Sequence, residues 1–181
     1  MIEQTLVLGL GNILCGDDGV GVRVVERLQT ARSFPADIRI LDGGTLGLDL
    51  LPYVREADRL LIVDSMEMNA APGTVVRRCD DEVDACLVPK LSPHQMGLRD
   101  LLGAARLCGY RLNELILWGV QPGDLRTGLE LSAPVAASID AIVSAVLSEL
   151  NLQESRLARS AVSERSQPYH LAHGDSPVAP P

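Results

Sequence analysis

Thr5-Leu6-Val7-Leu8-Gly9-Leu10-Gly11-Asn12 is an apolar run that passes directly into a glycine-rich turn. A short apolar run of this kind is typical of a strand buried on both faces of a sheet. Behind the turn, apolar residues recur at the spacing of an amphipathic helix, at Val20, Val24, Val25 and Leu28. A buried strand, a tight turn and a helix in this order indicate an α/β fold.

The same alternation of strands and helices continues to about residue 150. Further strands are predicted at residues 38–41, 60–63, 74–78 and 115–120, and helices at residues 48–54, 92–105 and 132–150. The charged residues of the segment 74–78 favour an edge strand. We therefore predict a three-layer α/β/α fold with a mostly parallel, twisted sheet of about five strands.

The alternating pattern stops after residue 153. The last 28 residues contain four of the eleven prolines, several serines and no apolar period, and their charges balance. We therefore expect a single α/β domain over residues 1–153 and a flexible tail over residues 154–181. The net charge of −8 then belongs to the domain and not to the tail.

The composition limits the partners. The chain has 16 Lys and Arg residues against 24 Asp and Glu residues, and only 3% of its residues are aromatic. A nucleic-acid-binding protein usually presents a basic surface and aromatic residues on which bases stack. Because this chain offers neither, we do not expect it to bind nucleic acid.

Compartment signals point to the cytoplasm. The four cysteines form no CxxC pair, and the N-terminus has no basic segment that would indicate a signal peptide. The longest nearly apolar stretch, residues 129–147, contains Glu130 and Asp140, which argues against a membrane span. We predict a cytoplasmic protein with thiols in place of disulfides and no membrane span.

Acidic residues follow three of the predicted strands. Asp17 and Asp18 follow the first strand, Asp42 follows the second and Asp64 the third. In an open parallel sheet, ligands bind beyond the carboxyl ends of the strands, so these carboxylates are expected at one edge. The helix that starts at Ser92-Pro93-His94-Gln95 can bring an imidazole to the same edge. One imidazole with two or more carboxylates is a pattern for a divalent metal such as nickel, zinc or iron.

Each of these residues also has a simpler role open to it. The first turn of a helix keeps His94 neutral and able to bind metal, but a polar residue is ordinary there. Asp17 is placed to cap a helix, and Asp42 to hold the turn Gly43-Gly44. Asp64 has few structural uses at the end of an apolar strand.

The glycine loop at residues 9–12 also allows a nucleotide site. It lacks the third glycine of G-x-G-x-x-G, because Leu14 stands in its place. Asp17 and Asp18 would repel a phosphate at the start of the helix. We therefore regard a nucleotide site as poorly supported.

Four motifs in order resemble the hydrogenase maturation proteases. They are Gly9-Leu10-Gly11-Asn12-Ile13-Leu14 with Asp17-Asp18-Gly19-Val20-Gly21, then Asp42-Gly43-Gly44-Thr45, then Ile62-Val63-Asp64, then Ser92-Pro93-His94-Gln95 with Gly97-Leu98. The resemblance extends from about residue 5 to residue 150. It implies an endopeptidase that removes a C-terminal extension from the nickel-loaded precursor of the large subunit of a nickel–iron hydrogenase.

The resemblance also assigns roles to residues. It places metal contacts on Asp18, Asp64 and His94, and a further acidic position of the site on Asp42. The nickel is expected to be carried by the substrate, so that the protease, a monomer, holds no tightly bound metal of its own. The family resemblance further implies an aspartic-type peptidase, although the sequence does not identify the carboxylate that acts as general base.

Two alternatives remain open at this point. One is a non-catalytic, metal-sensing chaperone that docks on the hydrogenase subunit without cutting it. The other is a peptidyl-tRNA hydrolase-like esterase, a family that also begins with a strand running into Gly-Leu-Gly-Asn. Ile13 follows Asn12 here in place of the Pro-Gly of that family, and the basic surface for tRNA is missing.

Overall fold

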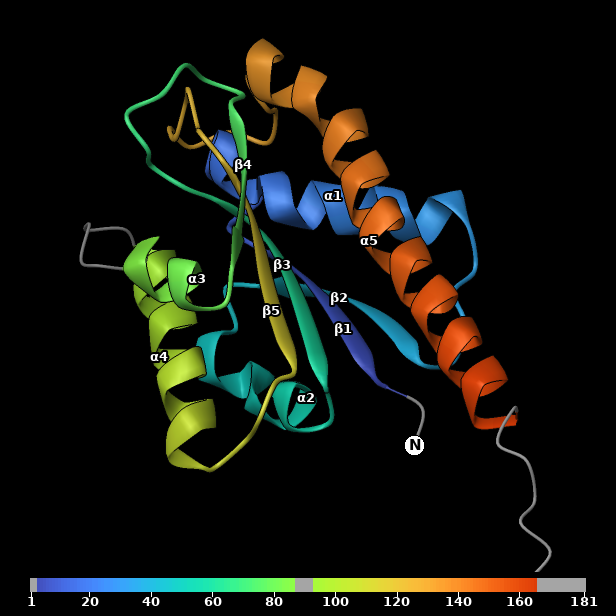
Figure 1. Cartoon of the computed structure of the whole chain (residues 1–181). Helices are drawn as coiled ribbons and strands as arrows, with labels where there is room; N and C mark the ends of the chain where they lie inside the picture. The colour runs from blue at the N-terminus through green and yellow to red at the C-terminus, as the bar shows by residue number, and fades with distance from the viewer. Residues whose placement is uncertain (1–2, 87–92, 166–181) are drawn as a thin grey trace, which may run out of the picture. The chain divides into compact units, whose positions relative to one another are not determined.

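Five strands form one sheet in the order β2-β1-β3-β5-β4 (Figure 1). The computed structural model describes residues 3–86 and 93–165, with side chains described for residues 3–86 and 97–151. All neighbouring strands are parallel except β4 and β5, which are antiparallel. The mostly parallel five-stranded sheet and the edge position of β4 are therefore confirmed. The strands are β1 (Thr5–Leu10), β2 (Ile38–Gly44), β3 (Arg59–Ser65), β4 (Val75–Cys79) and β5 (Glu114–Val120).

Helices connect the strands and cover both faces of the sheet (Figure 1). One of them, α3, is absent from the helices that the sequence predicts. It begins at Asp81, and its Val83 is fully buried. Acidic residues in a first turn are favourable because they complement the helix dipole. The elements are η1 (Gly16–Gly19), α1 (Val20–Ala31), η2 (Gly47–Leu50), α2 (Leu51–Arg55), α3 (Asp81–Cys86), α4 (Pro93–Leu107) and α5 (Ala133–Arg165), where η marks a 3-10 turn.

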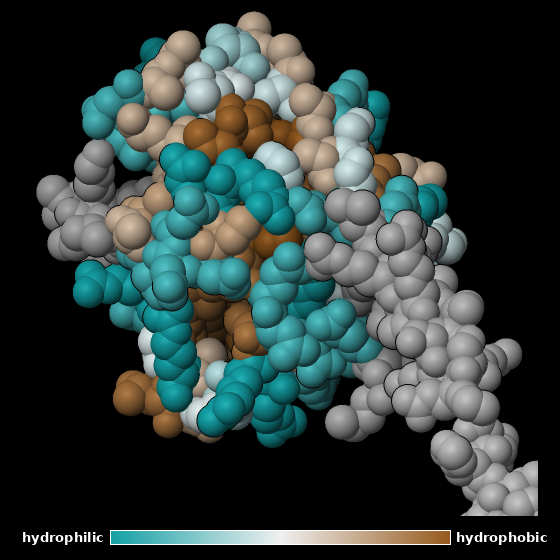
Figure 2. Space-filling view, in the orientation of Figure 1, coloured by the Kyte–Doolittle hydropathy of each residue, from teal (hydrophilic) through white to brown (hydrophobic). Residues whose placement is uncertain are grey.

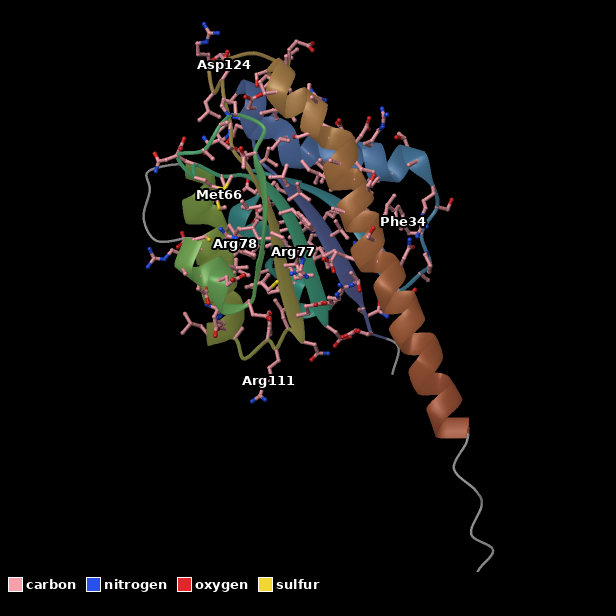
Figure 3. The ribbon with its side chains drawn as sticks, turned by 45° about the horizontal axis from the view of Figure 1, so that its top comes forward. Phe34, Met66, Arg77, Arg78, Arg111 and Asp124 are labelled. Atoms are coloured by element: carbon pink, nitrogen blue, oxygen red, sulfur yellow. The ribbon has the colours of Figure 1, made fainter. Side chains whose placement is uncertain are left out.

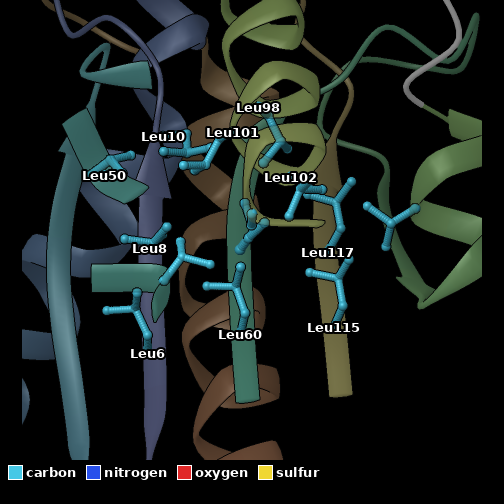
Figure 4. Close-up of a cluster of buried hydrophobic side chains, with 14 of the residues drawn as sticks. Leu6, Leu8, Leu10, Leu50, Leu60, Leu98, Leu101, Leu102, Leu115 and Leu117 are labelled. Atoms are coloured by element: carbon cyan, nitrogen blue, oxygen red, sulfur yellow. The ribbon is translucent and has the colours of Figure 1, made fainter. Parts of the chain in front are cut away.

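A leucine-rich core fills the space between the sheet and the helices α2 and α4. Alternate residues of β1, β3 and β5 face this core, as the twofold period of a strand requires. Leu98, Leu101 and Leu102 of α4 close it from outside. Figure 4 shows these side chains; the labelled ones on the strands are Leu6, Leu8, Leu10, Leu60, Leu115 and Leu117.

The other face of the sheet packs against α1 at glycine positions. A Cβ atom on Gly9 would lie 2.2 Å from the carbonyl oxygen of Gly21. A Cβ on Gly21 would lie 2.1 Å from the carbonyl oxygen of Val63 and 2.4 Å from that of Leu10. Since backbone approaches backbone here, only glycine lets α1 begin so close to the ends of β1 and β3.

Helix α4 begins at Pro93 and ends at Leu107, two residues beyond the end of the predicted range 92–105. Ser92 lies outside the described residues. Gly109, with a φ of 76°, donates its N–H to the carbonyl of Arg106, and Tyr110 donates to Ala105. This pair of bonds is the Schellman motif that commonly ends helices at a glycine.

Helix α5 is longer than the sequence analysis predicts. It continues to Arg165, so residues 154–165, expected in the tail, are helical, and residues 166–181 lie outside the described residues. The contacts divide the chain into two compact units, Met1–Val146 and Leu147–Pro181. Their boundary falls inside α5, and the expected boundary after residue 153 stays a prediction.

One segment of α5 has the dimensions of a membrane helix. Ala133–Asn151 is long enough to cross a bilayer, and its mean hydropathy is 1.5 with 28% of the window buried. The window starts after Glu130, one of the two charges on which the expected absence of a span depends. Core helices of soluble proteins also meet these criteria, so length and composition alone do not assign a membrane role.

The glycine contact generates a prediction about stability. Replacement Gly21→Ala forces α1 away from the strand ends and lowers the free energy of unfolding by about 2–3 kcal/mol. Gly103→Ala is the matched control, because Gly103 also lies within a helix but nothing lies within 4 Å of an added Cβ. It raises the free energy of unfolding by about 0.5–1 kcal/mol through helix propensity. Urea unfolding of both variants measures the difference; equal effects would contradict the close packing at Gly21.

Candidate functional site

The strand order creates a crevice at the carboxyl ends of β1 and β3. The strand β2, which follows β1 in the chain, pairs with one side of β1, while β3 pairs with the other side. The connections that leave β1 and β3 therefore diverge. Ligands of open α/β sheets bind at such a switch point. The residues after β1 and at the end of β3 are thus the first candidates for function.

Asp64 lies at this crevice and is the residue before the last of β3. It pairs in register with Gly119 of β5 and is only 3% exposed. Leu60 and Ile62, which share its face of the strand, point into the core beneath α4. Asp64 therefore lies on the face of the sheet that α4 covers. A carboxylate buried among leucines is costly, and such a residue is more often retained for function than for stability.

Asp18 lies beside Asp64, in the turn that follows β1. Its turn, η1, packs against β3, and the residue is 8% exposed. The N–H of Asn12 donates to Asp18 Oδ2 over 2.8 Å. This bond closes the loop from residue 12 to residue 18 and fixes the carboxylate at the strand ends. Asp18 and Asp64 thus both lie near the carboxyl ends of β1 and β3, while their role in one site stays a prediction.

Asp17, the neighbour of Asp18, has a different role. It does not cap α1, whose cap is Gly19 without a side-chain hydrogen bond. Its fully buried carboxylate instead accepts the N–H groups of Gly123, Asp124 and Ser132 and the hydroxyl of Ser132, over 2.6–2.8 Å. The possible capping role is thus replaced by a clamp that ties η1 to the loop after β5.

The clamp also determines the ionisation of Asp17. Burial alone would raise the pKa of this carboxyl group, but the hydrogen bonds from Ser132 and the backbone N–H groups outweigh burial and lower the pKa below its ordinary value of 3.8. The carboxylate is charged and its oxygens are already occupied by donors. Asp17 is therefore poorly suited to bind a metal or to take a proton.

The loop containing the clamp is exposed at its far end. Asp124 and Arg126 form an exposed ion pair there, and the hydrogen bond from Arg126 lowers the pKa of Asp124 to about 2. Figure 3 shows Asp124 at the end of the molecule opposite Arg111, which precedes β5. The carboxyl ends of the parallel strands thus lie at the end of the molecule where Asp124 is found.

Gln121, the residue after β5, holds the segment that follows Asp64 and β3. Its buried amide oxygen accepts the N–H of Met68 over 2.7 Å and that of Ala70 over 3.2 Å, and its amide nitrogen donates to Glu67 over 3.1 Å. These bonds fix the segment that leaves β3. Sequence reasoning missed both Gln121 and Ser132, since neither belongs to a motif and their partners are distant in the chain.

Asp42 is not part of the pair of buried acids. It is exposed, and it pairs in register with Gly9, so that it lies on the α1 face of the sheet, opposite to the face of Asp64. The strand β2 also continues past it to Gly44 and does not break at Asp42 as expected. A register shift next to this position absorbs the extra residue. A catalytic role of Asp42 stays a prediction.

His94 belongs to the first turn of α4, and its side chain lies outside the described ones. The next turn of the helix lies at a cavity. Gly97 and Leu98 line a cavity of about 130 Å³ together with Leu10 and the segment after β2, residues 44–50. The start of α4 therefore lies at the same edge of the sheet as Asp18 and Asp64.

The complete metal-binding set remains a prediction from the sequence. Among the side chains that the structure describes, no group of three His, Cys, Asp or Glu residues is arranged to hold a metal ion. The side chain of His94 is not among the described ones. Of the three expected metal contacts, the structure describes the side chains of Asp18 and Asp64, and their role as ligands stays a prediction.

Comparisons with known proteins point to one family. The family model HycI, hydrogenase maturation protease, matches residues 22–149. The hydrogenase expression/formation protein HupD of Rhodobacter capsulatus is 43% identical over 150 residues, which cover 82% of this chain and 71% of that protein. The hydrogenase 2 maturation protease of Escherichia coli is 42% identical over 148 residues, covering 81% of this chain and 90% of that protein.

Solved structures agree with the sequence relatives. The hydrogenase maturating endopeptidase HybD from Escherichia coli superposes with a TM-score of 0.78 at 42% identity and covers 82% of this chain and 92% of its own. The [NiFe] hydrogenase maturation protease HybD from Thermococcus kodakarensis gives a TM-score of 0.68 at 28% identity, with 81% and 98% covered. Similarity in sequence and in fold thus extends over the same domain.

The clamp at Asp17 generates a prediction about acid stability. Because the folded pKa lies below the ordinary value, the stabilisation is complete above pH 3.8 and is lost as the pH falls through the folded pKa. Asp17→Asn lowers the free energy of unfolding by about 2–4 kcal/mol at neutral pH, since the added amide N–H meets donors. The difference from the unmodified protein shrinks at acidic pH.

The matched control is Asp140→Asn, which removes an exposed ion pair with Arg27 and changes the free energy of unfolding by less than about 0.5 kcal/mol. Thermal or urea unfolding between pH 3 and pH 7 measures both. A pH-independent difference for Asp17→Asn would contradict the assignment of a charged clamp.

Proposed function

The chain belongs to the hydrogenase maturation protease family, and we propose that Asp18, Asp64 and His94 contact the nickel of its substrate. The substrate is the precursor of the large subunit of a nickel–iron hydrogenase, from which the enzyme removes a C-terminal extension. The family match assigns the chain to the proteases and not to peptidyl-tRNA hydrolase-like esterases. It also favours a protease over a non-catalytic chaperone.

The observation that carries the proposal is the pair of buried acids at the switch point. Asp18 and Asp64 come from different connections of the sheet and both lie at the carboxyl ends of β1 and β3. Two carboxylates held in a crevice disfavour anions and favour a cation. A peptide segment that carries nickel provides such a cation, and the net charge of −8 adds to its attraction.

The chemistry is the addition of water to one peptide bond. The water oxygen bonds to the scissile carbonyl carbon, the C–N bond breaks, and the products are a new carboxyl terminus and a free amine. Nickel carried by the substrate polarises this carbonyl or lowers the pKa of the attacking water. A carboxylate of the crevice takes the proton of the water as general base and returns it to the leaving nitrogen. Asp18 and Asp64 are the carboxylates proposed for this role, whereas Asp17 accepts four hydrogen bonds as a clamp.

A nickel carried by the substrate makes the metal a signal as well as a reagent. Structural metal sites in proteins usually have four protein ligands, whereas a site with fewer leaves positions for other groups. Asp18, Asp64 and His94 provide three contacts, so the remaining ligands come from the precursor. The enzyme then needs no tightly bound metal of its own, and a precursor without nickel lacks part of the recognised surface.

Several further features belong to the same proposal. The enzyme acts in the cytoplasm as a monomer without a membrane span, and it is grouped with aspartic-type peptidases by its use of carboxylates. The four cysteines are free thiols in the structure, which suits a reducing compartment. Asp42, exposed beside the crevice on β2, is proposed to contribute to the site from outside the buried pair.

The site assignment predicts the activity of three variants. Asp18→Asn, Asp64→Asn and His94→Ala each lower the rate of cleavage of nickel-loaded precursor at least about 100-fold, because each removes a ligand or a base. Asp140→Asn, on the exposed face of α5, keeps the normal rate. Gel and mass analysis of the precursor measure the shortening. Normal cleavage by all three folded variants would refute the assignment.

Nickel dependence tests how the metal enters the reaction. The unmodified enzyme is incubated with precursor that was purified without nickel and with the same precursor after nickel loading. Only the loaded precursor loses the mass of its extension, because the nickel supplies part of the binding contact. If both precursors are cut at the same rate, substrate-borne nickel is not the recognised element. If the loaded precursor binds but keeps its mass, the chain is a metal-sensing chaperone and not a protease.

A further inference from the structure

Exposed hydrophobic side chains gather at one end of the sheet. Among the side chains that the structure describes, seven large hydrophobic ones are exposed, and six lie on the segments that follow β1, β2 and β5. These six residues, here named the apolar rim, are Ile13, Leu14, Leu46, Leu48, Leu125 and Leu129, with 37–59% of their surface exposed. The seventh, Leu107, is the last residue of α4 and is 92% exposed.

The apolar rim contrasts with the rest of the described surface. On the face shown in Figure 2, hydrophilic residues cover much of the molecule, and hydrophobic residues are exposed in smaller patches between them. Single exposed leucines are ordinary, but a cluster on adjoining loops typically marks an interaction site. All three segments follow carboxyl ends of parallel strands, so the apolar rim lies at the same edge as the crevice.

Backbone hydrogen bonds join the three segments into one surface. The N–H of Gly11 donates to the carbonyl of Gly44 over 3.0 Å, which joins the segment after β1 to the one after β2. Gly128 donates to Leu14 and accepts from Gly16, both over 2.9 Å, which joins the segment after β1 to the one after β5. The clamp at Asp17 adds four more bonds to the second junction.

These backbone bonds preorganise the apolar rim for binding. Loops that must become ordered on binding lose part of the binding free energy, and loops already held by backbone bonds do not. The carbonyl of Leu14 accepts the N–H of Gly128, the residue before Leu129, so backbone bonds fix the two segments that carry these leucines. Thr45 and Gly47, the chain neighbours of Leu46, line a cavity of about 130 Å³, a volume similar to that of cavities that hold a benzene ring.

We propose that the apolar rim is the surface on which the folded, nickel-loaded precursor docks, apart from the contacts that its extension makes in the crevice. This inference rests on the proposed function, which requires a protein substrate to reach Asp18 and Asp64 at this edge. The central segment of the rim, residues 11–18, also carries Asp18. Any protein surface that delivers a peptide bond to the crevice therefore covers the rim.

The test compares rim variants with a control leucine. The double variant Leu14→Asn with Leu129→Asn removes the pair of side chains at the junction of two segments. Leu107→Asn makes the same change at the other end of α4. For cleavage of nickel-loaded precursor, the double variant raises KM about tenfold and leaves kcat within about twofold, because ground-state and transition-state binding weaken equally. Leu107→Asn changes neither, and melting temperatures confirm that all variants are folded.

The outcomes separate this inference from the proposed function. A normal KM for the folded double variant overturns the docking surface. If the double variant loses self-association in sedimentation while its KM is normal, the rim binds a second copy and the inference is likewise overturned. If the unmodified enzyme does not shorten the precursor, the proposed function fails. Binding of the precursor to the unmodified and double-variant proteins, measured by interferometry, then still decides the docking surface.

Discussion

The start of α1 packs directly against the ends of β1 and β3, backbone against backbone. Gly9 and Gly21 leave no space for a side chain, so the backbone of α1 touches the carbonyl oxygens of Leu10 and Val63. Residues 11–19 must then fold back over the strand ends within a short loop. Gly11, with a φ of 118°, makes this reversal possible. The constraint that packs the helix on the sheet is therefore also the one that places Asp18 beside β3.

The consecutive residues Asp17 and Asp18 have different roles in this turn. Both Asp17 and Asp18 are buried, and a buried carboxylate must obtain partners to remain charged. Asp17 obtains them from the loop after β5 and becomes a structural group. Asp18 turns to the crevice, where it accepts the N–H of Asn12. The bonds of Asp17 hold the turn, and this fixes the backbone position of Asp18 for the role proposed for it.

The sequence predicted the fold because the chain marks its elements locally. A few adjacent residues are enough to indicate an apolar strand, a helical spacing or an end of α4. The carboxyl ends of parallel strands necessarily share one edge of the sheet. It did not predict the partners of Asp17, because Ser132 is more than a hundred residues away and belongs to no motif. The length of α5 was missed because the segment after residue 153 was judged by its overall composition, although Leu157, Ala158, Ala161 and Val162 recur at helical spacing.

The position of Asp42 illustrates a third limit. A strand-end acid can be placed on either face of the sheet, and only the register decides which one. Asp42 pairs with Gly9 and so lies on the α1 face, whereas Asp64 lies on the α4 face. A residue that forms part of a sequence motif can therefore stand apart from the group that the motif suggests. Asp42 and Asp64 both stand at motif positions, but the pleat of the sheet places them on opposite faces.

Charge and hydrophobicity meet on the same loops in this protein. Charge acts over longer distances than apolar contact, so a negative crevice attracts a cationic centre, while apolar side chains act only once surfaces touch. The bonds between residues 11–18 and the loop after β5 hold both the crevice and part of the apolar rim. The proposed recognition of the metal and the proposed docking of the protein that carries it therefore depend on one support. This support is built mainly from backbone groups, with Asp17 as the side chain that joins them.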